Sequence, residues 1–164
     1  MRGYVVERWL KGPEELVLRD DVPEPSVTNL KEGEVIVDVK AIGLNFYEIL
    51  MIQGKYQIKP PFPFIPGSEL SGVIIAAHPS VKNYKVGDRV FGSNFSYAER
   101  IIIDTKNILP IPTNFSFEEA AGLYITYPTS YAALVLRAQL KQGEVCLIHA
   151  AAGGVGIAAV QIAK

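Results

Sequence analysis

Residues 144–164 read EVCLIHAAAGGVGIAAVQIAK, a short apolar run followed by a glycine-rich turn and a second apolar run. The first run, Glu144–His149, predicts a buried strand, and Val155–Lys164 predicts a helix. Between them, Ala151–Gly156 (AAGGVG) fits the dinucleotide fingerprint G-x-G-x-x-G with alanine in the first glycine position. A strand, a glycine turn and a helix in this order indicate the first βα unit of a nucleotide-binding sheet.

The spacing of the glycines has a physical reason. Gly153 lets the backbone approach a pyrophosphate without a Cβ in the way, and Gly156 lets the helix pack closely on the strand. The N-terminus of the helix adds free amide groups and a partial positive charge. We therefore expect Ala152, Gly153, Gly154, Val155 and Gly156 to bind a dinucleotide, although a plain tight turn between a strand and a helix is the alternative.

The nucleotide-binding unit is incomplete within these residues. Each further βαβ unit takes roughly 30 residues, and the residue that reads the ribose should follow the glycines by about 20. A strand at Val145–Ile148 has no parallel neighbour, and the helix after it has no sheet face to cover. We expect the sequence to be the first part of a longer polypeptide; otherwise it is a noncatalytic fragment or a binding module made of the barrel alone.

The sequence before residue 113 has the pattern of a β-rich domain, because short apolar stretches alternate with Gly and Pro. The clearest strand is Glu34–Ile42, where Val35, Val37 and Val39 alternate with residues of mixed polarity. A short helix is expected at Asn45–Gln53. Further strands are expected at Tyr4–Trp9, Leu16–Arg19, Glu69–Ala77, Arg89–Phe91, Tyr97–Ile103 and Ile108–Pro112.

Helical patterns begin after this β-rich part. Ser116–Glu119 (SFEE) is a capping box, which predicts the start of a helix. A second helix is expected to begin near Pro128, a residue suited to a first turn. Its apolar face would carry Tyr131, Leu134, Val135 and Ala138.

Composition excludes several classes of function. With 16 basic and 17 acidic residues and a net charge of −1, the chain has no excess charge to attract nucleic acid or anionic lipid. Its one cysteine, Cys146, excludes an intramolecular disulfide and fits a reducing compartment. No run approaches the ~18 apolar residues that a membrane helix needs. We expect a soluble, cytoplasmic protein that binds neither nucleic acid nor membranes.

Several motifs in a fixed order support a family assignment. They are GLNFYEIL at 43–50, QGKY at 53–56, PFIPGSELSGVI at 63–74, VGDRVFG at 86–92, SFEEAAGL at 116–123 and HAAAGGVGIAAVQIAK at 149–164. Together they resemble the zinc-independent quinone oxidoreductases, the zeta-crystallin-like group of the medium-chain dehydrogenase/reductase superfamily. The resemblance implies a mainly β fold, with a GroES-like β-barrel catalytic domain at residues 1–125. A linker helix and the first βα unit of a truncated Rossmann domain would follow at 126–164.

The same resemblance implies NADPH in the cleft between the two domains and a homodimeric parent protein. Zinc-dependent relatives carry a cysteine where this chain has Asn45 and a histidine where it has Ser68. Because zinc needs about four ligands, the scattered Cys146, His78 and His149 make a poor set, and no metal is expected.

The resemblance also assigns site residues. Asn45 and Thr129 would face the nicotinamide, and Tyr56 would line the substrate mouth, which makes Asn45 and Tyr56 the candidate catalytic residues. Each has a simpler alternative: Asn45 could only cap the following helix, Thr129 could be a first-turn residue, and Tyr56 could be a half-buried aromatic.

The implied reaction is hydride transfer from NADPH to a quinone or a related α,β-unsaturated carbonyl (an enone). Tyr56 would donate a hydrogen bond or a proton to the developing oxygen. A second reading is a 2-enoyl thioester reductase, because Met51–Tyr56 (MIQGKY) is similar to the stretch that carries the proton-donating tyrosine of mitochondrial enoyl reductases. The glycine turn resembles the quinone reductase version more closely. The 164 residues alone are expected to be inactive.

Overall fold

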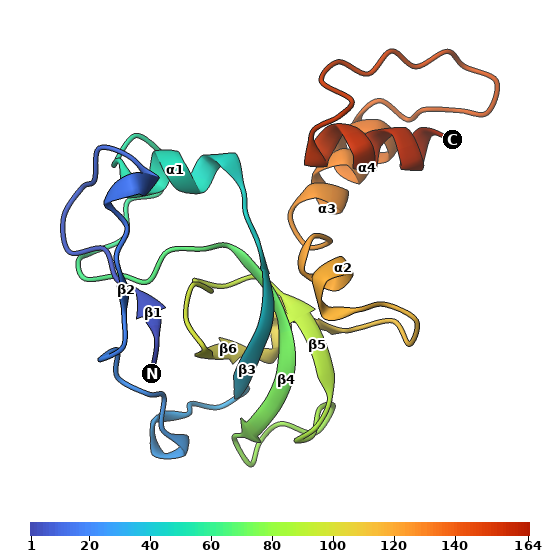
Figure 1. The fold of residues 1–164 in the computed structure, drawn as a ribbon. Helices are drawn as coiled ribbons and strands as arrows, with labels where there is room; N and C mark the ends of the chain where they lie inside the picture. Colours follow the sequence, from blue (N-terminus) through green and yellow to red (C-terminus); the bar gives the residue numbers. More distant parts are fainter.

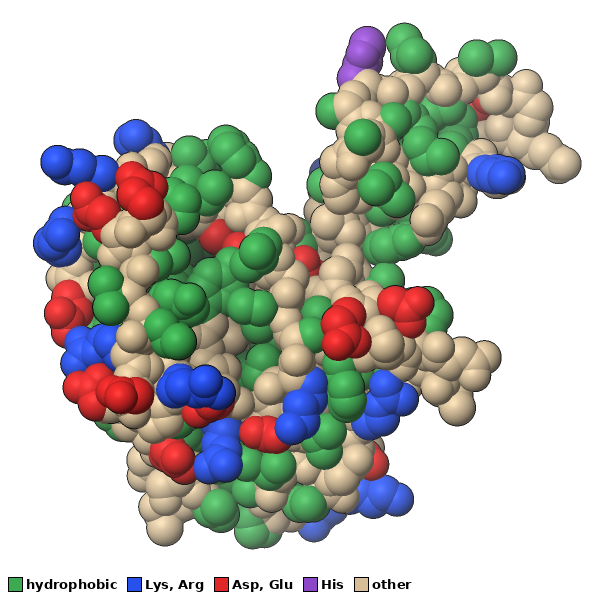
Figure 2. All heavy atoms as spheres, in the orientation of Figure 1, with side chains coloured by type: hydrophobic (Ala, Val, Ile, Leu, Met, Phe, Trp, Pro, Cys, Tyr) green, Lys and Arg blue, Asp and Glu red, His purple; other side chains and the backbone are tan.

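The computed structural model describes the whole chain, residues 1–164. Its β-rich part and its C-terminal helices form two lobes, as Figure 1 shows. The space-filling view in Figure 2 shows a hollow between these lobes. The N-terminus lies on the β-rich lobe, and the C-terminus lies on the helical lobe.

Antiparallel strands build the β-rich lobe. Its main sheet has the order β6-β3-β4-β5-β7. These strands are β3 (Glu34–Gly43), β4 (Glu69–Ala77), β5 (Arg89–Gly92), β6 (Arg100–Asp104) and β7 (Ile108–Pro110). A smaller sheet pairs β1 (Gly3–Tyr4) with β2 (Leu18–Arg19). Register shifts between Ile36 and Val37 and between Val39 and Ala41 interrupt the β3–β4 ladder, and such irregularities bend a strand.

The alternating pattern of β3 explains the core. Val35 and Val37 are fully buried and belong to the largest hydrophobic cluster of the lobe. The other buried members of this cluster are Leu70, Ile74, Val90, Ala98, Ile101, Ile103 and Ile108. Since these side chains come from every strand of the main sheet, the sheet curls around them.

Several expected strands are shorter than the sequence pattern indicates. Leu16–Arg19 pairs only at Leu18–Arg19, and Ile108–Pro112 pairs only to Pro110. The stretch Tyr4–Trp9 continues beyond β1 only as a single bridge between Val6 and Phe64. Farther along, the amide of Leu10 donates to the carbonyl of Ile52 at 2.9 Å, so this part of the chain bonds to the end of the helix at Phe46–Ile52 and not to a strand. Tyr97–Ile103 pairs continuously only from Arg100 onward.

The helices begin where the caps predict. In α2 (Phe117–Ala121), Ser116 Oγ accepts the Glu119 amide at 3.1 Å, and the Glu119 carboxylate accepts the Ser116 amide at 2.8 Å. α3 (Thr126–Tyr131) has Pro128 in its first turn and continues as a π-helix, η4 (Ala132–Arg137). The remaining helices are α1 (Phe46–Ile52), α4 (Gly154–Ala163) and the 3-10 turns η1 (Pro13–Glu15), η2 (Val27–Asn29) and η3 (Thr105–Asn107). None of them has the length and hydropathy that a bilayer crossing demands.

The strand expected at Glu144–His149 is not formed. The segment has no strand partner, and Val145 and Leu147 are 99% and 79% exposed. The prediction is wrong for this structure because a parallel strand needs a neighbour for its amide and carbonyl groups, and no other strand lies in the helical lobe.

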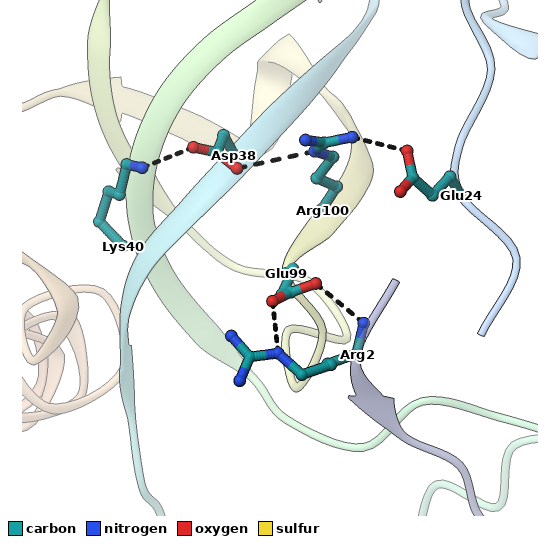
Figure 3. Close-up of polar contacts among 6 residues, drawn as sticks. All are labelled: Arg2, Glu24, Asp38, Lys40, Glu99 and Arg100. Atoms are coloured by element: carbon teal, nitrogen blue, oxygen red, sulfur yellow. Dashed lines mark hydrogen bonds and ion pairs between the residues drawn. The ribbon is translucent and has the colours of Figure 1, made fainter. Parts of the chain in front are cut away.

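Two exposed ion pairs join the N-terminal segments to β6 or the residue before it, and two more lie within the main sheet (Figure 3). They are Arg2–Glu99 at 2.7 Å, Arg100–Glu24 at 2.6 Å, Arg100–Asp38 at 3.7 Å and Lys40–Asp38 at 2.6 Å. Solvent-exposed pairs of this kind add little stability, so the core, and not these pairs, holds the lobe together.

Candidate functional site

A pocket of about 430 Å³ lies between the two lobes. The end of β3 and the start of α1 form one wall, with Asn45 and Phe46. The first turn of α4 forms the opposite wall, with Gly154 and Val155. Glu69 of β4 also lines the pocket. The pocket therefore brings the predicted glycine turn opposite the predicted Asn45.

Asn45 is held by its place at the end of a helix. It is the N-cap residue of α1, and its backbone amide donates to the Glu48 carboxylate at 2.8 Å. Its side-chain Nδ2 donates to Ser68 Oγ at 3.1 Å and to Glu69 Oε1 at 2.8 Å. The capping interpretation of Asn45 is confirmed, and the same residue also lines the pocket.

Two buried carboxylates stand behind Asn45. Glu48 is 4% exposed and accepts hydrogen bonds from Ser68 Oγ and from the Tyr97 hydroxyl. Glu69 is 2% exposed and accepts the backbone amide of Ile125 at 3.1 Å as well as the Asn45 side chain. Buried carboxylates of this kind need donors because desolvation disfavours their charge.

Burial also shifts the acid–base properties of this cluster. Desolvation raises the pKa of Glu69 above its ordinary value, and the hydrogen bonds from Asn45 and from the backbone at Ile125 oppose this shift only in part. Desolvation, together with the hydrogen bond to Glu48, raises the pKa of Tyr97, so its hydroxyl stays protonated at neutral pH.

Our sequence analysis did not single out Glu48 or Glu69. A signal was present, because each acidic residue interrupts a run of apolar residues: FYEILMI for Glu48 and PGSELSGVI for Glu69. A charged residue in a buried run needs a partner or a function.

The α4 wall rests on α3. Ser130 Oγ donates to the carbonyl of Val155 at 2.7 Å, and the Tyr127 hydroxyl donates to the Gln161 side chain. At Gly156 an added Cβ would collide with the carbonyl oxygen of Ala150 and lie 2.7 Å from Ala151 Cα. Gly156 thus allows a close backbone approach, although the approach is to the preceding turn and not to a strand.

The predicted cofactor residues are only partly brought together. Gly154, Val155 and Asn45 line the pocket, whereas Ala152 and Gly153 are exposed just before α4 and Gly156 is buried. Thr129 is exposed on α3, and its hydroxyl donates to the carbonyl of Ile125 at 2.6 Å. Thr126, one turn earlier, lines the pocket instead.

Tyr56 lies apart from this pocket. Its ring is half-buried and packs on Tyr47, with 5.0 Å between ring centroids. Tyr47 belongs to the first turn of α1, two residues after Asn45.

A second pocket, of about 490 Å³, lies on the other side of Asn45. Mostly apolar side chains line it, among them Ile42 and Phe46, and Glu48 and Tyr97 add polar groups. Asn45, Leu44 and Phe46 line both pockets, which makes this short segment the wall between them.

The donor set at Asn45 does not fit a metal. The side chains of Asn45 and Ser68 are hydrogen-bonded to each other and to the two carboxylates. The chain contains no cluster of three or more His, Cys, Asp or Glu residues arranged to hold a metal ion.

Known proteins are similar to this chain over most of its length. The alcohol dehydrogenase GroES-like domain family matches residues 31–113. Quinone oxidoreductase-like protein 2 of Rattus norvegicus is 44% identical over 94% of this chain and 43% of its own length. Quinone oxidoreductase of Homo sapiens is 40% identical over 93% of this chain and 46% of its own length.

Solved structures agree as well. A probable oxidoreductase from Mycobacterium abscessus superposes with a TM-score of 0.90 at 43% identity, over 99% of this chain and 52% of that one. A quinone oxidoreductase from Thermus thermophilus, whose NADPH complex is also known, superposes with a TM-score of 0.81 at 38% identity, over 99% and 50%.

The chain therefore belongs to the alcohol dehydrogenase GroES-like domain family and corresponds to the N-terminal portion of quinone oxidoreductase-like proteins of the medium-chain dehydrogenase/reductase superfamily. It spans about half the length of the curated relatives it matches. The GroES-like part of the predicted fold is confirmed. A Rossmann sheet is not seen, since the helical lobe contains no strand.

Proposed function

We propose that this chain supplies the barrel domain and the first cofactor-binding turn of an NADPH-dependent reductase that transfers hydride to quinones or related α,β-unsaturated carbonyls. Residues 1–125 would form the catalytic domain, and 126–164 would form the linker helix and the start of the nucleotide-binding domain. The observation that carries the proposal is the pocket in which Asn45 faces the first turn of α4.

The α4 wall suits a diphosphate. The first turn of a helix has amide groups without intrahelical partners and carries a partial positive charge. A Cβ added at Gly153 would find no atom other than the Ala150 carbonyl oxygen within 4 Å, at 3.5 Å, so the approach to this turn is open. Gly153, Gly154 and Val155 would hold the diphosphate, and Asn45 would meet the nicotinamide end.

NADPH, when bound, supplies the hydride, so the residues of the chain have to orient the reactants and exclude water. The apolar pocket beyond Asn45 suits the ring of a quinone or the carbon chain of an enone. Such a substrate would place its reacting carbon near Asn45, at the wall shared by both pockets.

The first test compares lengths. We expect the 164-residue chain to bind NADPH about 100-fold more weakly than a polypeptide of the relatives' length, a difference of about 2.7 kcal/mol, because the rest of the nucleotide site is missing. Isothermal titration calorimetry of both proteins measures this difference. Equal affinities would contradict the proposed division of the site.

The second test concerns the proton donor. We expect Tyr56→Phe, made in the longer protein, to lower turnover of an enone far more than turnover of a small quinone. Both products take up a proton, but the enolate formed from an enone is more basic than the hydroquinone monoanion formed from a quinone, so it depends more on a proton donor. Tyr47→Phe is the matched variant, since Tyr47 packs on Tyr56 and lies two residues after Asn45 in the chain. Equal losses on both substrates would remove Tyr56 as the donor, and a selective loss in Tyr47→Phe would assign the role to Tyr47.

A further inference from the structure

We propose that Glu69 is a positioning residue: its buried carboxylate fixes the direction of the Asn45 side-chain amide and joins the two walls of the pocket. As a result Asn45 offers the pocket an acceptor oxygen and not a donor. The proposal deepens the proposed function, on which its cofactor-binding consequence rests.

The direction of the hydrogen bonds is set first at Glu48. This carboxylate accepts from Ser68 Oγ, from the Tyr97 hydroxyl and from the Asn45 backbone amide. Because the one proton of the Ser68 hydroxyl is given to Glu48, its oxygen can only accept from Asn45. The donor in the Asn45–Ser68 contact is therefore Nδ2, with 3.1 Å between the two atoms.

The contact with Glu69 identifies Nδ2 of Asn45 as a hydrogen-bond donor independently of Ser68. An ionised carboxylate has no proton to donate, so the group of Asn45 that lies 2.8 Å from Glu69 Oε1 must be Nδ2. Both protons of Nδ2 are then used, one on Ser68 and one on Glu69. Oδ1 carries no hydrogen and has two lone pairs, so it is the side-chain atom of Asn45 that can accept a hydrogen bond from a ligand.

The other oxygen of Glu69 reaches the helical lobe. Oε2 accepts the amide of Ile125, the N-cap residue of α3, and α3 in turn carries α4. One carboxylate thus holds Asn45 on the barrel wall and the base of the helix that supports the opposite wall. Carboxylates that accept backbone and side-chain amides form stronger bonds than neutral acceptors do.

The space around Glu69 is tight on the β3 side. A Cβ added at Gly43 would collide with Glu69 Oε1 and lie 2.7 Å from the carbonyl oxygen of Ala121. Glycine at this position lets β3 approach the carboxylate closely, which limits the rotamers open to Glu69.

This polarity defines what Asn45 can recognise. A free amide oxygen accepts an N–H or O–H group, so it selects a ligand with a donor, such as the carboxamide or a hydroxyl of a nicotinamide nucleotide. It cannot stabilise negative charge that develops on a substrate oxygen. The donor for that oxygen must come from another residue.

The test is Glu69→Gln. Glutamine presents one oxygen and one NH2 to two donors, Asn45 Nδ2 and the Ile125 amide, so one of them must lose its acceptor or Asn45 must turn over. In the 164-residue chain, we expect the side-chain NH2 of Asn45 or the amide of Ile125 to exchange with solvent about tenfold faster by NMR, as for one lost buried hydrogen bond. In the longer protein, NADPH affinity should fall by about tenfold or more.

The double variant Asn45→Asp/Glu69→Gln reverses the bond. The introduced aspartate would accept from the NH2 of the introduced glutamine and from the Ser68 hydroxyl, whose proton would turn away from Glu48, which keeps its bonds from Tyr97 and from the backbone amide of residue 45. The oxygen of the introduced glutamine would accept the Ile125 amide, and an acceptor would still face the pocket. We expect the double variant to recover most of the lost Ile125 protection and NADPH affinity. A double variant no better than Glu69→Gln would overturn the proposal, since a purely structural role predicts an added loss.

The matched control is Glu99→Gln, which alters an exposed glutamate paired with Arg2. It should change neither the proton exchange rates at Asn45 and Ile125 nor the NADPH affinity. If Glu69→Gln does not fold, the unaltered chain still decides: both side-chain protons of Asn45 should exchange more slowly than those of the exposed Asn83 and Asn114. Fast solvent exchange of the Asn45 side-chain protons would contradict the proposed hydrogen bonds from Nδ2 to Ser68 and Glu69. Absence of NADPH binding in the longer protein would instead contradict the proposed function and leave the exchange measurement to judge Glu69.

Discussion

At the scale of single residues, the sequence predicts a structural role when that role depends only on residues nearby in the chain. Asn45 was expected either to face the nicotinamide or only to cap the helix that follows, and it does lie at the N-cap position of α1. The contacts of Asn45 with Ser68 and Glu69 join residues more than twenty positions apart, so no local pattern could reveal them. Its contact with a cofactor stays a prediction.

The pKa of Glu69 makes a testable statement about stability. Because burial raises this pKa in the folded state above the ordinary 4.5, the folded chain holds the proton more tightly than the unfolded chain does. The stability that protonated Glu69 contributes is thus present below about pH 4.5 and is lost as the pH rises through the native pKa.

We therefore expect Glu69→Gln, relative to the unaltered chain, to gain free energy of unfolding as the pH is raised from 4 to 8. The gain is about 1.4 kcal/mol for each tenfold difference in proton affinity between the folded and unfolded states. Urea denaturation at several pH values measures it.

Glu99→Gln should change in the opposite direction. The bonds from the backbone and side chain of Arg2 lower the pKa of Glu99, so its contribution appears above its ordinary pKa and is lost on acidification. If both variants change stability in the same direction with pH, the buried cluster does not titrate as described.

At the scale of elements, strands and helices with strong internal patterns were predicted correctly, whereas strands that depend on a partner were predicted too long or do not form. The alternation in β3 and the capping box of α2 are encoded within a few residues. Tyr4–Trp9 and Tyr97–Ile103 carry β-type residues, but the length of each ladder depends on where the opposite segment turns away. The sequence of one segment does not contain that information.

Gly153, the N-cap residue of α4, and Gly156, in the first turn of α4, should respond differently to alanine. Gly156→Ala places a Cβ against the Ala150 carbonyl, and we expect it to destabilise the chain by about 1–3 kcal/mol, as overpacking does. Gly153→Ala meets its nearest atom at 3.5 Å and should fold normally. In the longer protein, Gly153→Ala should nevertheless weaken NADPH binding, because its methyl group lies at the proposed diphosphate position.

Thermal unfolding and calorimetric titration of both variants separate packing from binding. The assignment of the turn fails if Gly153→Ala leaves NADPH affinity intact, since the glycine would then have no ligand to accommodate.

At the scale of the whole molecule, the two lobes differ in how completely they are folded. The β-rich lobe has a closed core, whereas Val145 and Leu147 of the helical lobe face solvent. The sequence predicted a strand here because EVCLIH is apolar, and the structure lacks the parallel neighbour that such a strand requires.

We expect residues 145–148 to pair as a strand in a polypeptide of the relatives' length. Hydrogen exchange followed by mass spectrometry should show these amides protected in the longer protein and unprotected in the 164-residue chain. Rapid exchange in both proteins would show that this segment never enters a sheet.

The seating of α4 on α3 has a mechanical consequence. Ser130 and Tyr127 hold α4 on α3 through hydrogen bonds, so the two helices form one unit. The segment 122–125, where Glu69 accepts the Ile125 amide, joins this unit to the barrel and is the place where a hinge rotation would occur. A few degrees of rotation at this hinge would change the distance between the glycine turn and Asn45, while the hydrogen bonds between the strands of the barrel stay intact.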